Sequence, residues 1–355
     1  MSRGFEGYVN IREGNGWSSQ VATVPGFYLK AKSVELDSGI SFIENDDLIV
    51  QGRGYKASTR TPGKKVPSAK ITFQARADDV SLIAMSHFQM CEVTTSGGTA
   101  TYKFVPVSCH PTFTSGSDAY GTGSYSTDSG TLFTLEVTQK MNCEATENGQ
   151  RISGAFCDKF KFTSALNEHV VIEAEMRGIA YSTLDLASAT DPDNAAFGSY
   201  SSKAAFNYFS GTLSLLGGTV GNDFIVSSFD FVSDNKTEDR MTIGSQNPST
   251  YSWGKIQLTG DIKLDVPAAA TRQIGSLIAD TAFSIVGTWS NSANERMIVS
   301  IPSCKRNPFV VSGAGGESVS EMTIPFRAFE SEDGNTAPIT FTTVTMGLGS
   351  LFNPI

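Results

Sequence analysis

The stretch SSFDFVSDNKTEDRMTIGSQNPSTYSWGKIQLTGDIKLDV, which runs from Ser227 to Val266, decides the fold of this chain. At its start Phe229 and Phe231 alternate with polar residues, and the alternation returns over the last ten or so residues. A period of two residues predicts a strand that is buried on one face. The strands enclose a polar segment of about twenty residues, 235–253. A structureless loop of that length in a compact domain is uncommon, and is usually functional or disordered.

The same arrangement occurs earlier in the chain. A strand at 40–44 leads into a polar segment, 45–67, and a second strand follows at 69–74. Each unit is followed by a segment with apolar residues at helical spacing, 78–88 in the first half and 268–279 in the second. A strand, a long loop, a strand and a helix in the same order twice indicate an internal duplication.

The later strands keep this order. Residues 283–288 correspond to 133–138, and the strand around Arg327 corresponds to the strand around Arg177. We therefore predict a mainly β fold of two tandem β-sandwich or barrel domains, each with one flanking α-helix and one long inter-strand loop. The predicted boundaries are a first domain with an N-terminal arm at 1–190, a linker at 191–203, a second domain at 204–345 and an apolar tail at 346–355.

Composition excludes several classes of protein. The net charge of −9 argues against a dedicated nucleic-acid-binding protein, which would normally carry a basic face. No apolar run approaches the roughly 20 residues of a membrane span, and the N-terminus lacks the apolar core of a signal peptide. The five cysteines form no Cys-x-x-Cys pair, which indicates reduced thiols in a protein made in a reducing cytoplasm.

The sequence offers little chemistry. It contains no GxSxG, HExxH, EF-hand or complete phosphate-binding motif, so we expect no catalytic residues, no metal and no cofactor. His87 falls on the apolar face of the first helix, where a core histidine is expected. Cys109 and His110 are adjacent, so in a strand they would point to opposite faces and could not share a zinc ion. Glu173 and Glu175 share one strand face and could form a carboxylate dyad, but a solvated sheet face is the simpler interpretation.

Several segments together resemble the tail tube proteins of tailed bacteriophages, in particular the family with two tandem tube domains. The resemblance is carried by GYVNIREGNGWSSQVA near the N-terminus, by the two strand–loop–strand units, and by IVSIPSCKRNPFVVSGAGGESVSEMTIPFRAF near the C-terminus. It covers nearly the whole chain and keeps the order of elements. The excursion Thr112–Gly130 and the tail after Thr345 are less typical of the family.

The resemblance implies a structural virion protein with two tail-tube-like domains. Such subunits polymerise into stacked rings around the channel through which DNA is ejected, and two fused domains imply trimeric rings with pseudo-sixfold symmetry. It also implies other tail proteins as partners (tape measure, terminator and tip), genomic DNA in transit without specific binding, no membrane contact, and assembly in the host bacterial cytoplasm into the virion tail. An acidic protein suits this role because a basic channel would hold the DNA. The residues predicted to face the lumen are Glu136, Glu173 and Glu175.

In this interpretation the two long loops make the contacts between rings, because Arg, Tyr and Trp are strong interface anchors. The simpler alternative is a pair of flexible surface loops. The predicted contact residues are Arg53, Tyr55, Lys56, Arg60, Lys64, Lys65, Glu238, Asp239, Arg240, Tyr251 and Trp253. The apolar tail residues Leu348, Leu351, Phe352 and Ile355 are predicted to dock on a neighbouring subunit.

Two other functions are compatible with the same residues. One is a minor tail component of the same fold, such as a terminator or a tip-proximal ring. The other is a virion adhesin built from two β domains, for which an exposed aromatic cluster or a metal site would be expected. An enzyme ranks third, because it would require a pocket that gathers the scattered histidines with carboxylates.

Overall fold

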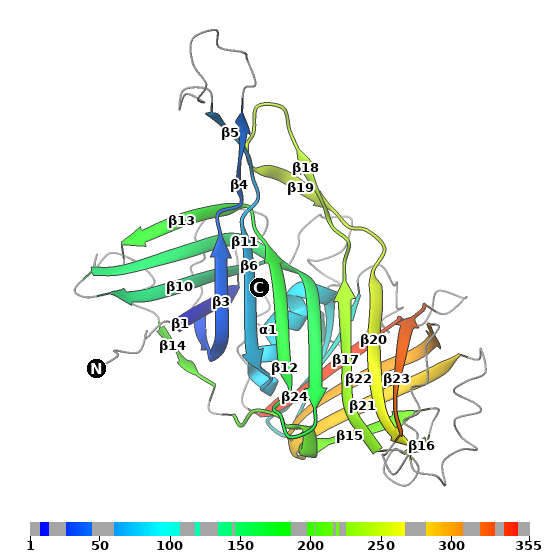
Figure 1. The fold of residues 1–355 in the computed structure, drawn as a ribbon. Coiled ribbons are helices and arrows are strands. Elements are labelled where there is room, and N and C mark those ends of the chain that lie inside the picture. Colours follow the sequence, from blue (N-terminus) through cyan, green and yellow to red (C-terminus); the bar gives the residue numbers. More distant parts are fainter. Residues whose placement is uncertain are drawn as a thin grey trace.

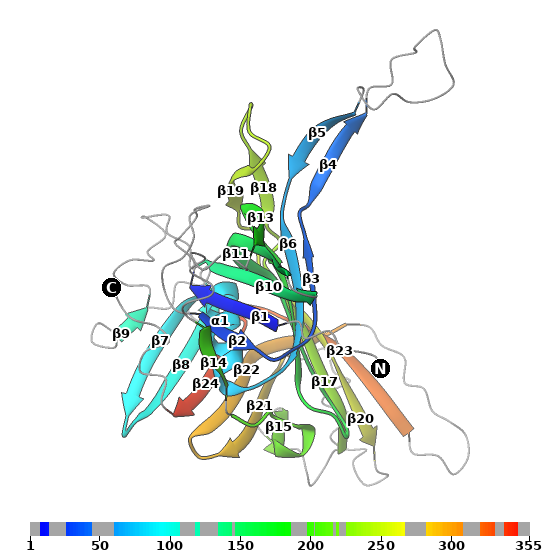
Figure 2. The same ribbon diagram turned by 90° about the vertical axis from the view of Figure 1, so that its left-hand side faces the viewer.

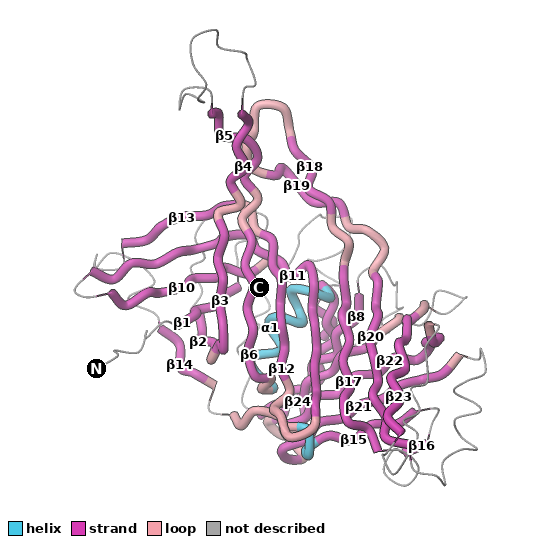
Figure 3. The backbone as a smooth tube through the Cα atoms, viewed as in Figure 1, coloured by secondary structure: helices cyan, strands magenta, loops and turns pink. Residues whose placement is uncertain are grey.

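The computed structural model describes residues 8–13, 26–44, 60–106, 118–120, 134–143, 146–185, 197–201, 203–215, 218–219, 225–266, 282–307, 320–330 and 337–346. Within these residues strands dominate, accompanied by one α-helix, α1 (Ala77–Phe88), and one 3-10 helix, η2 (Tyr208–Ser210). Figure 3 shows both helical segments against a backbone of strands and loops. The predicted mainly β fold is confirmed.

Seven strands lie side by side in one antiparallel sheet, which we call the long sheet (Figure 1). Their order is β3 (Ala31–Asp37), β6 (Ser68–Gln74), β12 (Val171–Arg177), β11 (Thr146–Ala165), β17 (Ile225–Asp234), β20 (Gln257–Val266) and β23 (Ser320–Ala328). Burial alternates along these strands, as in β12, where Ile172, Ala174 and Met176 are buried and the residues between them are not. One face of the long sheet therefore covers the core and the other is polar.

A second run of strands packs behind the long sheet. Its order is β9 (Asp118–Tyr120), β7 (Gln89–Ser96), β8 (Thr99–Pro106), β24 (Thr340–Met346), β22 (Glu295–Arg306), β21 (Phe283–Ser292), β15 (Gly211–Leu215) and β16 (Gly218–Thr219). A third run shares the first part of β11. Its order is β13 (Ala180–Asp185), β11, β10 (Leu135–Cys143), β1 (Tyr8–Glu13), β2 (Gly26–Leu29) and β14 (Phe197–Tyr200).

The strand order repeats between the two halves of the chain. The first half pairs β3–β6–β12–β11 and β1–β10–β11–β13. The second half pairs β17–β20–β23–β22 and β15–β21–β22–β24 in the same sequence. In each half one strand belongs to both series: β11 in the first half and β22 in the second. The same two series of strand pairings therefore occur once in each half of the chain.

The halves are joined into one body. β11 of the first half pairs with β17 of the second over seven residues, from Lys159↔Asp234 to Ala165↔Ser228. β24 pairs in turn with β8. A single cluster of buried apolar residues runs through both halves. Residues 197–200, inside the predicted linker, form β14 beside β2, so part of that segment is a paired strand.

Helix α1 lies in the core between the sheets, where it contacts β11, β24, β8 and β7. The helix predicted at 78–88 is present, but all of its residues except Asp78 are buried, so it has no solvated face. Its polar residues are satisfied inside the protein: Ser81 Oγ donates to Ala77 O (2.8 Å) and lies 2.7 Å from Thr343 Oγ1. The aromatic core around it includes Phe88, whose ring centroid is 5.9 Å from that of Phe160.

Two hairpins extend from one end of the long sheet (Figure 2). They consist of β4 (Ile40–Glu44) with β5 (Arg60–Lys65), and of β18 (Glu238–Met241) with β19 (Pro248–Ser252). The sequence predicted a loop over 235–253; residues 238–241 and 248–252 of that segment are instead paired strands, and the prediction was wrong there. The second predicted helix at 268–279 and all of the excursion 112–130 except β9 lie outside the described residues.

Candidate functional site

The two hairpins occupy equivalent places in the repeat. The β4–β5 hairpin, which we call the first arm, connects β3 with β6, and the β18–β19 hairpin, the second arm, connects β17 with β20. Each is a separate two-stranded sheet beyond the end of the long sheet (Figures 1 and 2). A feature that is retained twice and projects from the body is the best candidate for a functional site in the described part of the chain.

The first arm leaves the body at Gly39. Its φ of +60° lies in the left-handed region, and a Cβ atom at this position would be 1.7 Å from Val66 O. The Gly39 amide donates to Asp37 Oδ1 (3.0 Å), and the Val66 amide donates to Gly39 O (3.1 Å). Only glycine allows the two strands to approach this closely.

The two arms contact each other within one chain. The Lys65 amide donates to Gln246 O (2.8 Å), and Gln246 Nε2 donates to Pro62 O (3.1 Å). Lys64 Nζ forms an ion pair with Asp239. The sequence predicted that Lys64 and Asp239 act in contacts between rings, whereas the structure pairs them inside one subunit.

A polar cluster fixes the base of the second arm. Arg177 Nε donates to Asp158 Oδ2 (2.9 Å), and Arg177 Nη1 donates to Asp239 Oδ1 (3.1 Å). Thr237 Oγ1 donates to Asp158 Oδ1 (2.7 Å). A register shift between Cys157 and Lys159 in the β11–β12 pair leaves Asp158 out of the ladder, and such a bulge can redirect a side chain.

Two aromatic residues of the second arm pack against the body. Tyr251 is 5 % exposed, its hydroxyl donates to Gly178 O (3.0 Å), and its ring meets Phe156 edge-on at 4.9 Å. Burial raises the pKa of the Tyr251 phenol well above its usual value. The ring centroid of Trp253 lies 5.1 Å from that of Phe156, and the Trp253 side chain remains 37 % exposed. Tyr251 is therefore an internal anchor of the arm, and its predicted place in an interface between rings does not fit its burial.

The exposed surface of the second arm combines charge with apolar side chains. Glu238 and Arg240 are exposed, and Arg240 Nη2 donates to Ser252 Oγ (3.1 Å). Met241 is exposed, and Ile243 at the hairpin turn is completely so, with a relative exposure of 104 %. Ile243 was missed from the sequence because a single isoleucine in a polar segment carries no periodic signal.

The remaining predicted arm residues lie mostly beyond the described part of the first arm. Lys65 is partly buried on β5. The side chain of Arg60, at the start of β5, and the residues Arg53, Tyr55 and Lys56 lie outside the described residues, as do the predicted tail residues Leu348, Leu351, Phe352 and Ile355.

The polar cluster of the arm adjoins a second polar network around His87 on α1. His87 is 1 % exposed, its Nδ1 lies 3.0 Å from Cys157 O, and its Nε2 lies 2.8 Å from Ser233 Oγ. A carbonyl oxygen can only accept, so Nδ1 carries the proton and the Ser233 hydroxyl donates to Nε2. Asn235 Nδ2 donates to His87 O (3.0 Å). Burial lowers the pKa of His87 to about 4, so the ring is neutral and ties α1 to both halves.

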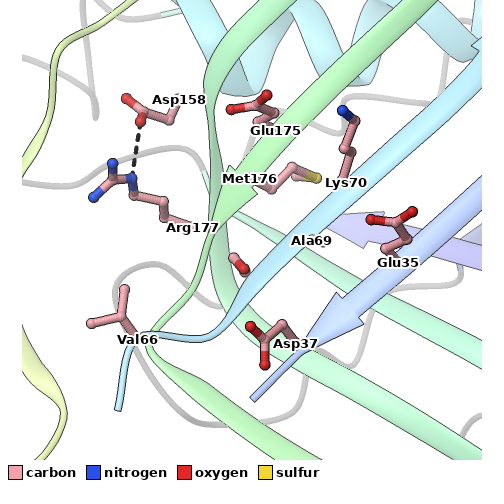
Figure 4. Close-up of a pocket in the computed structure, with 10 residues that line it drawn as sticks. Glu35, Asp37, Val66, Ala69, Lys70, Asp158, Glu175, Met176 and Arg177 are labelled. Carbon is pink, nitrogen blue, oxygen red and sulfur yellow. Dashed lines mark hydrogen bonds and ion pairs between the residues drawn. The ribbon is translucent and has the colours of Figure 1, made fainter. Parts of the chain in front are cut away.

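A cavity of about 460 Å³ opens beside the arm base, on the polar side of the long sheet. Figure 4 shows its charged lining, with Glu35, Lys70, Glu175 and Arg177 from β3, β6 and β12 around one space. Acidic and basic groups alternate there, so the cavity has no single sign of charge with which to select an ionic ligand.

The predicted lumen residues fall in two different environments. Glu173 and Glu175 lie on the polar face of β12, where Glu173 pairs with Lys70 (3.1 Å) and Glu175 with Lys159 (3.0 Å). Each carboxylate has its own lysine, which does not support the dyad interpretation. Glu136 is 1 % exposed and lies 3.1 Å from Arg151 Nε, so this carboxylate is not presented to a channel, and its predicted lumen position does not fit.

Among the described residues no group of three or more His, Cys, Asp or Glu side chains could hold a metal ion. The described cysteines, Cys91, Cys157 and Cys304, are buried as free thiols, and burial raises the pKa of each well above its usual value. Thiols of that kind are weak nucleophiles.

Comparison with protein-family models and with curated proteins found no match. Within the described residues no helix is both long and apolar enough to cross a membrane. The function must therefore be argued from the arms, the polar sheet face and the repeat.

Proposed function

We propose that the chain is a structural virion protein, the major tail tube subunit of a tailed bacteriophage, which polymerises into stacked rings around a channel for DNA. The observation that supports this most directly is the join between the halves. β17, the first strand of the second half of the long sheet, is covered by β11, the last strand of the first half. β3 is the equivalent of β17, and among the described strands it pairs only with β6.

The same pairing could form between two copies of the chain. The end of β22, the equivalent of β11, would then pair with β3 of a neighbouring copy. An uncovered strand edge is a template for such pairing. If each chain supplies two equivalent units, three chains give a ring with pseudo-sixfold symmetry. The polar face of the long sheet then surrounds the channel. Two of its lysines are paired with carboxylates, at Lys70–Glu173 and Lys159–Glu175, which leaves fewer free cations to hold DNA phosphates.

The arms project along the strands, beyond the end of the long sheet. In the proposed tube they make the contact with the next ring. Other tail proteins (tape measure, terminator and tip) are the further partners of such a tube, and the virion tail is its location. The proposal includes no catalytic activity. The separated carboxylates and the buried thiols described above do not support a catalytic activity.

Negative-stain microscopy of the purified protein tests the proposal. We expect hollow tubes of stacked rings, with a ring mass of three chains measured by native mass spectrometry. A protein that stays monomeric at all concentrations would contradict it. Closed single rings would favour the second candidate, a terminator or tip-proximal ring of the same fold.

Replacing residues 45–66 by a short Gly/Ser turn removes most of the first arm, including Lys64 and Lys65, and leaves the long sheet in place. We expect rings or free subunits without tubes. Tubes of normal length from this variant would show that the first arm does not make the contact between rings.

A further inference from the structure

Large exposed apolar side chains gather at the two opposite ends of the long sheet. At the arm end they are Ile40, Phe42, Met241, Ile243 and Trp253. At the other end the turn 166–169, between β11 and β12, exposes Leu166 (47 %), and η2 exposes Phe209 (70 %). We call this second surface the foot. The strand register places the two surfaces apart: β17 runs from the foot at its Ser228 end to the second arm beyond Asp234.

Hydrogen bonds hold the parts of the foot together. The Leu166 amide donates to Ser227 O (2.9 Å), and the Tyr208 amide donates to Glu168 O (3.0 Å). The Tyr208 hydroxyl donates to Val226 O, beside the carbonyl that holds Leu166. These bonds bring the turn and η2 together over the start of β17. Figure 3 shows the short helical segment at the end of the molecule away from the arms.

Phe209 is exposed from a fixed backbone. The Ser210 amide donates to Asn207 Oδ1 (2.8 Å), and the Asn207 amide donates to Ser210 Oγ (3.2 Å), which together form a capping box around η2. The Phe209 ring meets Tyr208 edge-on at 5.4 Å. A large apolar side chain that is rigidly presented to solvent loses little conformational entropy when it is covered by a partner.

The tip of the second arm has the same character. Gly244, at φ +89°, allows the tight turn, and the Ser245 amide donates to Thr242 O (3.0 Å). This turn holds Ile243 fully exposed next to exposed Met241. The charges also match, because exposed Arg240 borders the tip and exposed Glu168 belongs to the foot.

We propose that the second-arm tip of one copy, through Met241 and Ile243, docks on the foot of the next copy, at Leu166 and Phe209. The two surfaces are different parts of the same chain at opposite ends, so the contact is heterologous and continues from copy to copy. This inference rests on the proposed function and names the surface that receives the arm.

Complementary variants test the contact. Met241→Asp/Ile243→Asp removes the tip, and Leu166→Asp/Phe209→Asp removes the foot. Val286→Asp, at an exposed valine on β21 that belongs to neither surface, is the matched control. All the altered side chains are exposed, so thermal unfolding by circular dichroism should match wild type. We expect each double variant alone to stop at a single layer and the control to form tubes.

Mixing the two double variants gives the decisive measurement. Tip-deficient copies keep a foot and foot-deficient copies keep a tip, so one contact can form between them and no further one. Multi-angle light scattering should show a twofold rise in molar mass on mixing, with no longer polymer. If the foot-deficient variant alone assembles like wild type, or the mixture stays at the mass of its components, the proposed contact is wrong.

The outcomes separate this inference from the proposed function. Wild-type tubes together with normal assembly of the foot-deficient variant would overturn the docking contact and leave the tube subunit standing. Pairing of the two variants without any tube or ring from wild type would support the contact and contradict the tube subunit.

Discussion

Replacing His87 by Gln tests whether the buried network between α1, β11 and β17 holds the halves together in its neutral form. Gln is polar, does not titrate and can offer an amide N–H to Cys157 O and a carbonyl to the Ser233 hydroxyl. At pH 7.5 we expect the variant to lose about 1–2 kcal/mol of unfolding free energy, because one of the two buried hydrogen bonds is made poorly and the ring stacking on Phe160 (5.7 Å) is lost.

The pH dependence is the sharper part of this prediction. The pKa of His87 falls from 6.5 in the unfolded chain to about 4 in the folded protein, because burial disfavours the charged ring. Between those values the unfolded chain binds more protons, so the His87 contribution to stability is complete above pH 6.5 and is lost as the pH falls toward 4. At 1.36 kcal/mol per pKa unit, wild type should lose about 2.5 kcal/mol between pH 7.5 and 4.5 that the variant does not lose.

Urea titrations of dilute, unassembled subunits at both pH values measure the difference. His169→Gln, at an exposed histidine in the turn before β12, is the control and should follow wild type. A stability difference between wild type and His87→Gln that is the same at pH 7.5 and 4.5 would refute the reasoning, since it would mean that His87 titrates normally in the folded state.

Three further predictions use the same urea assay. Burial raises the pKa of Asp79 to about 6, so wild type should gain about 2 kcal/mol from this group between pH 7.5 and 4.5, a gain that is absent in Asp79→Asn; equal pH profiles would contradict it. Tyr251→Phe should cost about 1 kcal/mol through the lost bond to Gly178 O while the arm keeps its ring packing; no change would mean that the bond contributes nothing. Gly260→Ala should cost about 1–3 kcal/mol, because its Cβ would lie 2.2 Å from Asp230 O in the β17–β20 pair, and an unaltered midpoint would show that the pair can separate freely.

The individual strands of the long sheet could be predicted from the sequence because each buries one face, whereas their joining across the halves at β11–β17 was not predicted. β17 and β20 show the apolar–polar alternation that defines such a strand, and the structure pairs them with Phe229 opposite Ile262. The repeated order of strands in the two halves followed from the order of the same signals. In both cases the information is local, so it can be seen in the sequence.

The strand at 40–44 was predicted and is β4, but the other arm strands, β5, β18 and β19, could not be predicted because burial does not hold them. β18 is mostly exposed, and β5 contains Pro62 and Gly63, which usually interrupt strands. Their pairing depends on the partner strand and on bonds between the arms, such as the Lys65 amide to Gln246 O. Contacts between residues this far apart leave no pattern in either segment.

Buried polar residues were misjudged for the same reason. Asp79 and Ser81 give α1 the composition of a helix with a solvated face, yet both are buried, and the partner of Ser81 is Thr343, far along the chain. His87 was predicted to be a core histidine, and it is buried with Ser233 as a partner. Glu136 appeared suitable for a channel, and its partner Arg151 lies on the neighbouring strand β11. A sequence shows that a residue is polar, while the fold decides whether water or another side chain satisfies it.

The polar clusters bear on how the arms would work. Asp239 of the second arm binds Lys64 of the first and Arg177 of the body, and Asp158 joins Arg177 to Thr237. Both arms are thereby held in one orientation by the chain itself, before any second copy is present. A loop that is ordered only on contact would lose conformational entropy at every contact formed, whereas an arm that is already fixed loses little. In the proposed tube this favours many identical weak contacts along the axis, each made by a surface that need not rearrange.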